Sequence, residues 1–273
     1  MSVAIWSNEA GAVGHPMIAL IHGTMDRSSG MLRLSRRLDD RFRVLRFDRR
    51  GYGRSVPGEG EHPGPFDMRS QVEDLVALLA GRRALLVGHS YGGNIAMATA
   101  MLHPDVVAGV AIYETPLSWE PWWPGTTAGA AARATEGSTA EAAERFMRRL
   151  VGDAVWDGLP AKTRETRRAE GAALVGELRD LQANEPWHAD RITCPLVLGF
   201  GANGAAHHAR GMQFLHERFP DSQLFVLAAA RHDAPNSHSQ LFADTIVDAL
   251  AVAAGEPWAT ASRSVMKLVG DQG

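Results

Sequence analysis

Short apolar runs alternate with longer segments of helical periodicity along most of this 273-residue chain. Runs rich in Ile, Val and Leu are typical of parallel strands that are buried on both faces and joined by crossover helices. The alternation predicts an α/β fold: a doubly wound, mostly parallel sheet that binds ligands at the carboxyl ends of its strands. We expect strands at Met17–His22, Arg43–Phe47, Ala84–Gly88, Val107–Tyr113, Pro195–Phe200 and Gln223–Leu227, and an edge strand near Val3–Ser7. We expect helices at Met31–Asp39, Met68–Ala80, Tyr91–Leu102, Arg210–Arg218 and Gln240–Ala253.

The segment 116–190 interrupts this alternation. It contains no strand-like run, and its Ala, Arg and Glu residues recur at helical spacing. We therefore expect a helical cap over 116–190, inserted into a core formed by 1–115 and 191–254, and a polar tail over 255–273 with little packing of its own. Three tryptophans open the cap segment and either pin it to the core or line an apolar substrate pocket: Trp119, Trp122 and Trp123.

The charge balance bears on possible partners. Lys and Arg total 28 against 31 Asp and Glu, which gives a formal net charge of -3 and no basic stripe for nucleic acid or acidic lipid. No segment approaches the roughly 20 apolar residues of a membrane span, and the first residues show no leader pattern. The lone cysteine, Cys194, precedes a proline at the start of an apolar run, which indicates a reduced, buried thiol. We expect a cytoplasmic protein with a small-molecule partner and no nucleic-acid or membrane partner; the sequence does not indicate its oligomeric state.

The run Gly88–Gly92 places a serine in the pattern G-x-S-x-G, directly after a predicted strand and directly before a predicted helix. A tight turn between strand and helix requires small residues beside the serine, because the helix must pass close to the strand. Such a turn also holds the Ser90 hydroxyl at a helix N-terminus, where free N–H groups stabilise developing negative charge. We therefore predict that Ser90 is a catalytic nucleophile.

Two further runs accompany this turn: His22–Thr24 after one predicted strand, and Asp48–Ser55 after the next. Together with Gly88–Gly93, they resemble the α/β-hydrolase superfamily, over nearly the whole chain outside the cap and the tail. The resemblance implies the α/β-hydrolase fold and a serine esterase or lipase-like enzyme, with an oxyanion hole formed by the backbone N–H groups of Thr24 and Tyr91. We expect the arginines of the second run to form surface ion pairs that hold their loop: Arg49, Arg50 and Arg54.

A serine hydroxyl needs a base, and histidine is well suited because its pKa lies near neutrality. Among the eleven histidines, His232 follows the last predicted strand and precedes the final predicted helix. The resembled family carries its catalytic histidine there, and the order Ser, acid, His is respected. We predict that His232 is the general base, and that other histidines serve backbone turns or capping: His22, His89 and His238.

The adjacent pair His207-His208 is the only sequence feature that suggests a metal ion. Neighbouring side chains point in different directions, and no Cys, Asp or Glu at ligand spacing accompanies the pair. We therefore predict no metal site, and we expect no cofactor.

The triad acid is where this sequence departs from the pattern of the resembled family. The family usually carries an aspartate a few residues past a glycine after the next-to-last strand, but the position that aligns here is Gly204. Its neighbour Asn203 can orient an imidazole but cannot balance an imidazolium charge. Some members place the acid after the preceding strand, and here that strand is followed by Glu114. We predict Glu114 as the acid; a site without an acid and a site that uses another carboxylate are the alternatives.

A serine nucleophile indicates an acyl substrate, because attack on an alkyl carbon would leave an ether that water does not cleave. Haloalkane or epoxide opening would suit an aspartate at this position instead. We predict a serine hydrolase that cleaves small or medium carboxylic ester-like substrates through an acyl-enzyme intermediate. The alternatives are a C–C bond hydrolase, thioesterase or lactonase that uses the same triad, and a non-catalytic ligand-binding protein on a hydrolase scaffold.

Overall fold

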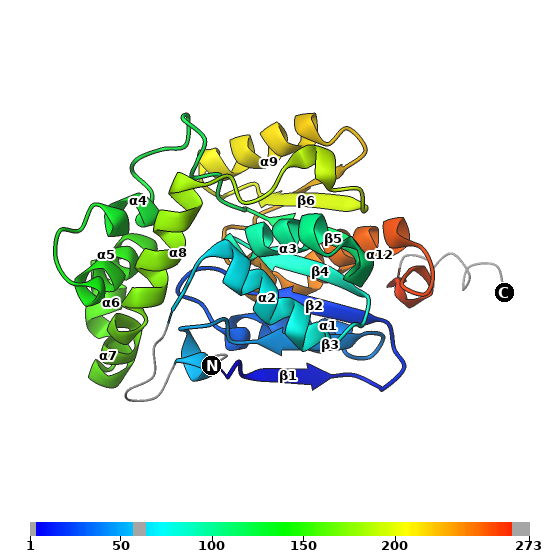
Figure 1. The fold of residues 1–273 in the computed structure, drawn as a ribbon, viewed down its shortest axis with the longest axis horizontal. Coiled ribbons are helices and arrows are strands. Elements are labelled where there is room, and N and C mark those ends of the chain that lie inside the picture. Colours follow the sequence, from blue (N-terminus) through cyan, green and yellow to red (C-terminus); the bar gives the residue numbers. More distant parts are fainter. Residues whose placement is uncertain (1–3, 57–63, 264–273) are drawn as a thin grey trace.

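A computed structural model describes residues 4–56 and 64–263, which form an α/β fold around a seven-stranded sheet (Figure 1). The strand order is β1-β3-β2-β4-β5-β6-β7. Only the β1–β3 pair is antiparallel in this sheet, so the predicted mostly parallel, doubly wound fold is confirmed. The strands are β1 (Ser7–Ala10), β2 (Met17–Ile21), β3 (Arg43–Phe47), β4 (Ala84–His89), β5 (Val107–Tyr113), β6 (Leu196–Gly201) and β7 (Gln223–Leu227).

The edge strand β1 lies further along the chain than predicted. It was expected near Val3–Ser7, of which Val3 lies outside the described residues, but it begins at Ser7 and is polar. Its Glu9 accepts hydrogen bonds from Arg43 at 2.9 Å and from Arg82 at 2.6 Å. An edge strand pairs on one side only and tolerates charged side chains, so an apolar pattern does not mark it. The other strands lie within one residue of their predicted ends.

Two layers of helices bury the two faces of the sheet. Successive residues of a strand point to opposite faces, so Ala19 packs into one core and Ile18 into the other. Helices α2 (Met68–Leu79), α3 (Tyr91–Leu102) and α9 (Ala206–Arg218) contribute to the core around Ala19. Helices α1 (Leu32–Leu38) and α12 (Asp248–Ala254) contribute to the core around Ile18. Burial on both faces explains why the central strands are apolar throughout.

Two predicted helices differ from the structure. Helix α9 begins at Ala206, four residues before the predicted Arg210, because its first turn is polar and carries no apolar spacing. The predicted helix Gln240–Ala253 is divided into α11 (Ser239–Phe242), a π-helical turn over Ala243–Val247 and α12, after a short helix α10 (Ala234–Ser237). The earlier start of α9 places the His207-His208 pair on a helix at the carboxyl end of β6.

Five helices lie between β5 and β6, and no strand occurs among residues 116–190. They pack together on one side of the sheet (Figure 1) around a core of their own that includes the fully buried Trp156. Met25 and Tyr52 of the body also belong to that core. The predicted extent of the cap as a domain stays a prediction. The five helices are α4 (Ala128–Arg133), α5 (Thr139–Val151), α6 (Asp153–Gly158), α7 (Ala161–Ala169) and α8 (Gly171–Ala183).

Buried charges join α8 to the body of the molecule. The Arg49 guanidinium lies 2.7 Å from the Glu177 carboxylate, and both side chains are fully buried. Tyr52 donates a hydrogen bond to the same carboxylate at 2.8 Å. The prediction that Arg49 and Arg50 form surface pairs was wrong: Arg49 pairs with the cap, and Arg50 is buried against Asp74.

The segment after α12 packs more than predicted. Trp258 is buried, and its indole N–H donates a hydrogen bond to the Met17 carbonyl at 3.0 Å. The expectation of a tail with little packing is therefore wrong at Trp258, whereas residues 264–273 lie outside the described part. Cys194 is a free, partly buried thiol, and burial raises its pKa to about 11. Among the described residues, no helix is both long and apolar enough to span a membrane.

Candidate active site

Ser90 occupies a strained turn between β4 and α3. Its φ of 54° and ψ of -128° lie outside the regions that non-glycine residues favour. Any side chain at three neighbouring glycines would overlap other atoms of the fold, because the helix starts directly against β2 and β5: Gly88, Gly92 and Gly93. The sequence therefore combines strain at the serine with the small residues that permit it.

The loop after β2 closes over this turn. A Cβ atom at Gly23 would lie 2.8 Å from Ser90 Cβ, so only glycine allows the loop to approach so closely. The next residue, Thr24, lines the same two cavities as Ser90. Neither the Thr24 nor the Tyr91 backbone N–H donates a hydrogen bond to another residue in the described part of the chain. Two unpaired donors thus flank the serine, one from each predicted oxyanion residue.

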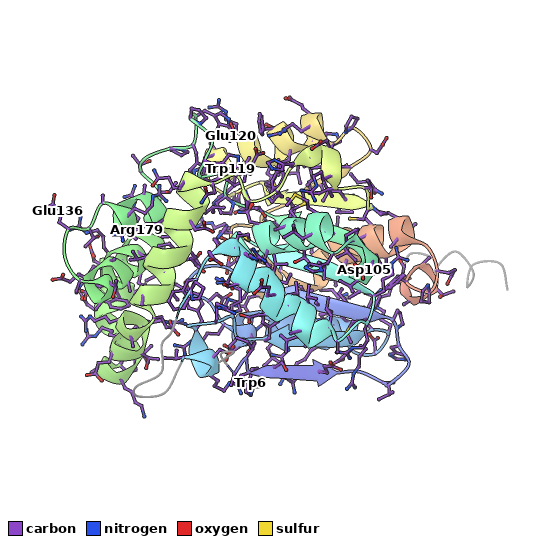
Figure 2. All side chains as sticks on the ribbon, viewed as in Figure 1. Trp6, Asp105, Trp119, Glu120, Glu136 and Arg179 are labelled. Carbon is purple, nitrogen blue, oxygen red and sulfur yellow. The ribbon has the colours of Figure 1, made fainter. Side chains whose placement is uncertain are left out.

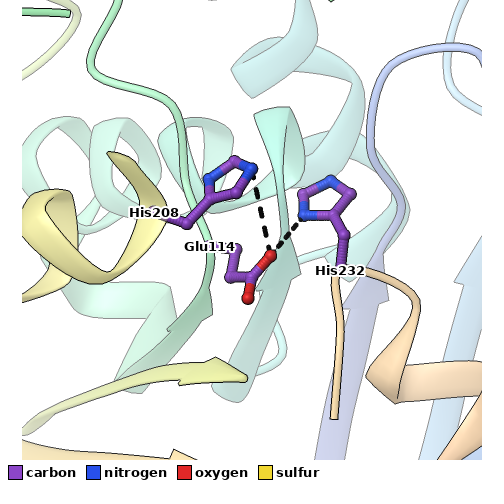
Figure 3. Close-up of side chains that lie close together, drawn as sticks. All are labelled: Glu114, His208 and His232. Carbon is purple, nitrogen blue, oxygen red and sulfur yellow. Dashed lines mark hydrogen bonds and ion pairs between the residues drawn. The ribbon is translucent and has the colours of Figure 1, made fainter. Parts of the chain in front are cut away.

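His232 and Glu114 come together from segments 118 residues apart. The imidazole Nδ1 donates a hydrogen bond to Glu114 Oε2 at 2.7 Å, and the carboxylate is fully buried (Figure 3). The other carboxylate oxygen accepts from the Gly201 backbone N–H at 2.9 Å. A buried carboxylate with these two partners holds the ring in one tautomer, with Nε2 free as a proton acceptor.

Gly204 makes room for this carboxylate. A Cβ atom at Gly204 would lie 2.6 Å from Glu114 Oε1, closer than real contacts allow. The glycine that replaces the aligned aspartate is thus part of the space into which Glu114 fits. Asn203 is not directed at the imidazole, since its amide donates to the Ala229 carbonyl at 3.4 Å. Of the two residues considered as partners of the base, Glu114 contacts His232, whereas Asn203 is bonded to Ala229 instead.

Two cavities meet at Ser90 and His232, which line both of them. One, of about 440 Å³, extends under the cap and is lined largely by apolar side chains, including Trp123 and Leu178. The other, of about 500 Å³, extends toward Met31 and the segment that follows His232. The site therefore has space on both sides of the serine.

Comparison with known proteins identifies the family to which this chain belongs. A family model described as the alpha/beta hydrolase family matches residues 18–245. This chain belongs to the alpha/beta hydrolase family. The hydrolase is 29% identical over 248 residues to a pimeloyl-[acyl-carrier protein] methyl ester esterase of Chromobacterium violaceum, covering 86% of this chain and 94% of that protein. A shorter match, 35% identical over 112 residues, relates 40% of this chain to 34% of epoxide hydrolase A of Mycobacterium tuberculosis.

The solved structures that resemble this hydrolase bear on its fold. The enol-lactonase from Burkholderia xenovorans superposes with a TM-score of 0.67 at 24% identity, covering 89% of this chain and 95% of that one. A thermophilic esterase from Thermogutta terrifontis gives a TM-score of 0.64 at 23% identity, covering 86% and 88%.

Two histidines that the sequence did not assign to the site surround His232 in the hydrolase. The His208 ring stacks on the His232 ring, with centroids 4.7 Å apart and planes at 15°, and its Nε2 lies 3.9 Å from Glu114 Oε2 (Figure 3). His89 approaches the His232 carbonyl at 2.7 Å through Nε2. The sequence signal for His208 was its place just after β6, at the carboxyl edge of the sheet, where functional groups gather.

Burial keeps both of these neighbours neutral. Desolvation and the nearby His232 lower the pKa of His89 to about 3, and the same causes lower the pKa of His208 well below its usual value. The 3.9 Å contact between His208 and Glu114 is therefore not an ion pair near neutral pH. His232 is left as the group that can carry positive charge next to Glu114.

Glu114, His208 and His232 also form a group whose potential ligand atoms lie within 4.8 Å of one another. The 2.7 Å separation of His232 Nδ1 and Glu114 Oε2 fits an N–H···O hydrogen bond. Nitrogen lone pairs lie in the ring planes, and the nearly parallel planes of the two stacked imidazoles do not converge on one ion. The arrangement fits a hydrogen-bonded base and acid better than a metal centre.

The three cap tryptophans have different places. Trp123 lines the cavity under the cap, beside His207 and His208. Trp119 packs edge-on against Trp187 (Figure 2 shows it where the cap segment passes near α9), and Trp122 packs against Phe214. The prediction of pocket-lining tryptophans therefore needs correction: Trp119 and Trp122 line neither cavity at Ser90, because they serve packing between the cap segment and the body.

Proposed function

We propose that this ester hydrolase cleaves small or medium carboxylic esters by covalent catalysis, with Ser90 as the nucleophile. The observation that carries the proposal is the hydrogen bond between a fully buried Glu114 and His232, beside a strained serine in a shared cavity. A serine needs a base to lose its proton, and that base needs an orienting group.

The reaction follows from these groups in two halves. In the first, the Ser90 oxygen forms a bond to the ester carbonyl carbon while its proton passes to Nε2 of His232. The tetrahedral intermediate then expels the alcohol, which takes the proton back from the imidazole. In the second half, water attacks the acyl carbon while one of its protons passes to His232 Nε2. The bond from the acyl carbon to the Ser90 oxygen then breaks, Ser90 takes the proton back from the imidazole, and the acid product leaves. Each half restores the neutral imidazole.

The charges that develop have matching groups. The carbonyl oxygen becomes an oxyanion, and the unpaired N–H groups of Thr24 and Tyr91 are the donors assigned to it. The imidazolium that forms on His232 lies next to the Glu114 carboxylate, which stabilises it without taking its proton. Because the carboxylate is buried, its charge is little screened by water.

The cavities and the relatives support the ester class. Two spaces of about 440 and 500 Å³ on either side of Ser90 suit an acyl part and an alcohol part of modest size. The methyl ester esterase and enol-lactonase to which the chain is similar are named for carboxylic ester bonds. The similarity to epoxide hydrolase A does not transfer, because a serine that opened an epoxide would form a stable ether.

A panel of p-nitrophenyl esters of increasing acyl length tests this function. We expect turnover with short and medium acyl groups, and Ser90→Ala should lower kcat by ~10³-fold or more, since the covalent step is lost. Mass spectrometry of the quenched enzyme should show one acyl group on Ser90. Labelling with a fluorophosphonate separates an enzyme from a binding protein: a wild-type protein that forms no adduct and cleaves no ester of the panel contradicts the proposal.

A further inference from the structure

An arginine-lined groove opens next to the active-site cavity. It has a volume of about 460 Å³ and lies between α1 and the segment that contains α10 and the start of α11. Three guanidinium groups of α1 form one wall: Arg33, Arg36 and Arg37. Asn236 and His238 are on the other wall. We refer to this concavity as the arginine groove.

The three arginines carry charge without a counterion. All three are exposed, and none forms an ion pair or a hydrogen bond with another residue in the described part of the chain. They stand at i, i+3 and i+4 on one helix, an arrangement in which like charges repel. Arg43 and Arg82, by contrast, are paired with Glu9. A concave surface lined by charges of one sign raises the local concentration of the opposite ion.

The arginine groove adjoins the cavity that holds Ser90. Asn236 lines both spaces. On the opposite wall, Met31 lines the active-site cavity, and Arg33, two residues later on the same segment, lines the groove. A ligand with its carbonyl at Ser90 would reach the arginines by passing Asn236.

The near and far ends of this path differ in charge. Asp26 and Asp233 line the cavity close to Ser90 and His232, together with Arg231. The nearer space thus mixes both signs and gives an anion little attraction. The arginine groove holds three cations and no acidic residue among its lining residues. An anionic group is favoured only at the far end, away from the bond that is cleaved.

We propose that the arginine groove binds an anionic group, a phosphate or a carboxylate, at the distal end of the substrate. This rests on the proposed function, because it assumes that the reacting carbonyl lies at Ser90. Guanidinium groups form paired N–H···O bonds to the oxygens of phosphates and carboxylates, so Arg suits either anion. The substrate class becomes an ester or thioester with a remote negative charge.

Two matched substrate pairs test the proposal. S-butyryl-4′-phosphopantetheine and S-butyrylpantetheine share one thioester but differ in the phosphate. Methyl hydrogen suberate and methyl octanoate share one methyl ester but differ in the terminal carboxylate. For each pair, the ratio of kcat/KM for the anionic substrate to that for the neutral one is measured. The groove variant is Arg33→Gln/Arg36→Gln/Arg37→Gln, which removes three exposed charges.

A variant of the same net charge serves as the control: Arg145→Gln/Arg179→Gln/Arg191→Gln, at exposed sites that line neither space. We expect at least one ratio to be roughly tenfold or more in the wild type and the control and to fall toward one in the groove variant. The preference should weaken in 0.5 M NaCl, since salt screens exposed charges. The pair that responds identifies the phosphate or the carboxylate as the anion. Ratios that are equal in all three proteins overturn the proposal.

A binding measurement separates this proposal from the proposed function. Calorimetric titration with tripolyphosphate, which is not an ester substrate, should give saturable heat with the wild type and the control but not with the groove variant. If no ester or thioester is cleaved, the proposed function fails, and the titration still decides whether the groove binds anions. Equal heats for the control and the groove variant overturn the groove assignment.

Discussion

Glu114 and Glu177 are both fully buried carboxylates, but their partners differ in kind. Glu177 in the cap lies 2.7 Å from the guanidinium of Arg49 and accepts a hydrogen bond from Tyr52. Glu114 in the active site accepts hydrogen bonds from a backbone N–H and from His232, and it has no Lys or Arg partner in the described chain. One buried charge has a permanent counterion, and the other has an imidazole partner that can gain or lose a proton.

The difference in partners distinguishes a pair that can only stabilise the fold from a pair that can also take part in proton transfer. A carboxylate removed from water needs partners, and a guanidinium supplies charge and hydrogen bonds at every accessible pH. The Arg49–Glu177 pair can therefore fasten α8 to the body, but it can transfer no proton. An imidazole balances a carboxylate fully only when it has taken up a proton, as it does in the transition state. The same residue type thus pairs with the body from the cap in one place and, on the proposed mechanism, assists proton transfer in the other.

Removing the carboxylate of the permanent pair should have the largest effect. Glu177→Gln leaves the Arg49 guanidinium buried without a counterion and should lower the free energy of unfolding by about 3–5 kcal/mol. Urea denaturation measures this change. The exposed pair of Arg69 and Glu73 gives the control, since Glu73→Gln should cost less than about 1 kcal/mol. A Glu177→Gln protein as stable as the Glu73→Gln protein would show that this pair does not fasten the cap.

Neutralising the other carboxylate should act on rate. Glu114→Gln keeps an oxygen that can accept from His232 but loses the charge that stabilises the imidazolium, so kcat should fall by ~10²-fold or more. Steady-state kinetics on the most active p-nitrophenyl ester measure the loss, and a melting curve checks that the variant is folded. Glu120→Gln, in the cap segment, is the control. A Glu114→Gln enzyme with near-wild-type kcat, together with an inactive Asn203→Ala enzyme, would mean that an amide orients the base.

The neutral histidines around the site should make stability depend on pH. The folded pKa of His89, about 3, lies below that of the unfolded chain, near 6.5. Its contribution is therefore complete above pH 6.5 and is lost as the pH falls from there toward 3. Each pH unit costs roughly 1.4 kcal/mol, so His89→Asn should remove about 2 kcal/mol of the destabilisation between pH 7 and pH 5. Urea titrations at both pH values test this, with His188→Asn at an exposed site as the control.

The smallest effect is expected at His208, which we regard as a positioning residue. Its ring stacks on His232 and its Nε2 lies 3.9 Å from Glu114 Oε2, so it covers one face of the His232 imidazole. His208→Phe keeps a flat ring there and should change kcat by less than about threefold, whereas His208→Ala should lower it by about tenfold, or 1.4 kcal/mol. The acidic limb of the pH profile should also shift in His208→Ala. Equal losses in both variants would point to a role for the imidazole nitrogens instead.

Much of this fold follows from local patterns. Buried strands and the turn around Ser90 depend on residues that are close in sequence, so apolar runs and glycines were enough to place them. The prediction of Glu114 also used position, since it follows a strand that ends at the catalytic edge. The contact with His232 then agreed with the order of the strands.

The predictions that failed concerned contacts between residues far apart in the sequence and elements built from polar residues. Arg49 reaches a glutamate 128 residues away, and nothing in a local pattern distinguishes it from the exposed Arg54. The polar edge strand β1 and the polar first turn of α9 lack the apolar spacing on which strand and helix predictions depend. The start of α9 mattered most, because it carries His208 to His232.

The steric relation between Gly204 and Glu114 also bears on how such a site evolves. Because a Cβ at position 204 would lie 2.6 Å from Glu114 Oε1, a side chain can enter there only if the Glu114 carboxylate shifts from its place beside His232. On the proposed mechanism, loss of Glu114 first would leave the enzyme without its triad acid. Each single substitution is therefore harmful in the background of the other residue, which is sign epistasis. A lineage that holds its acid after β5 is confined to that solution unless both positions change together.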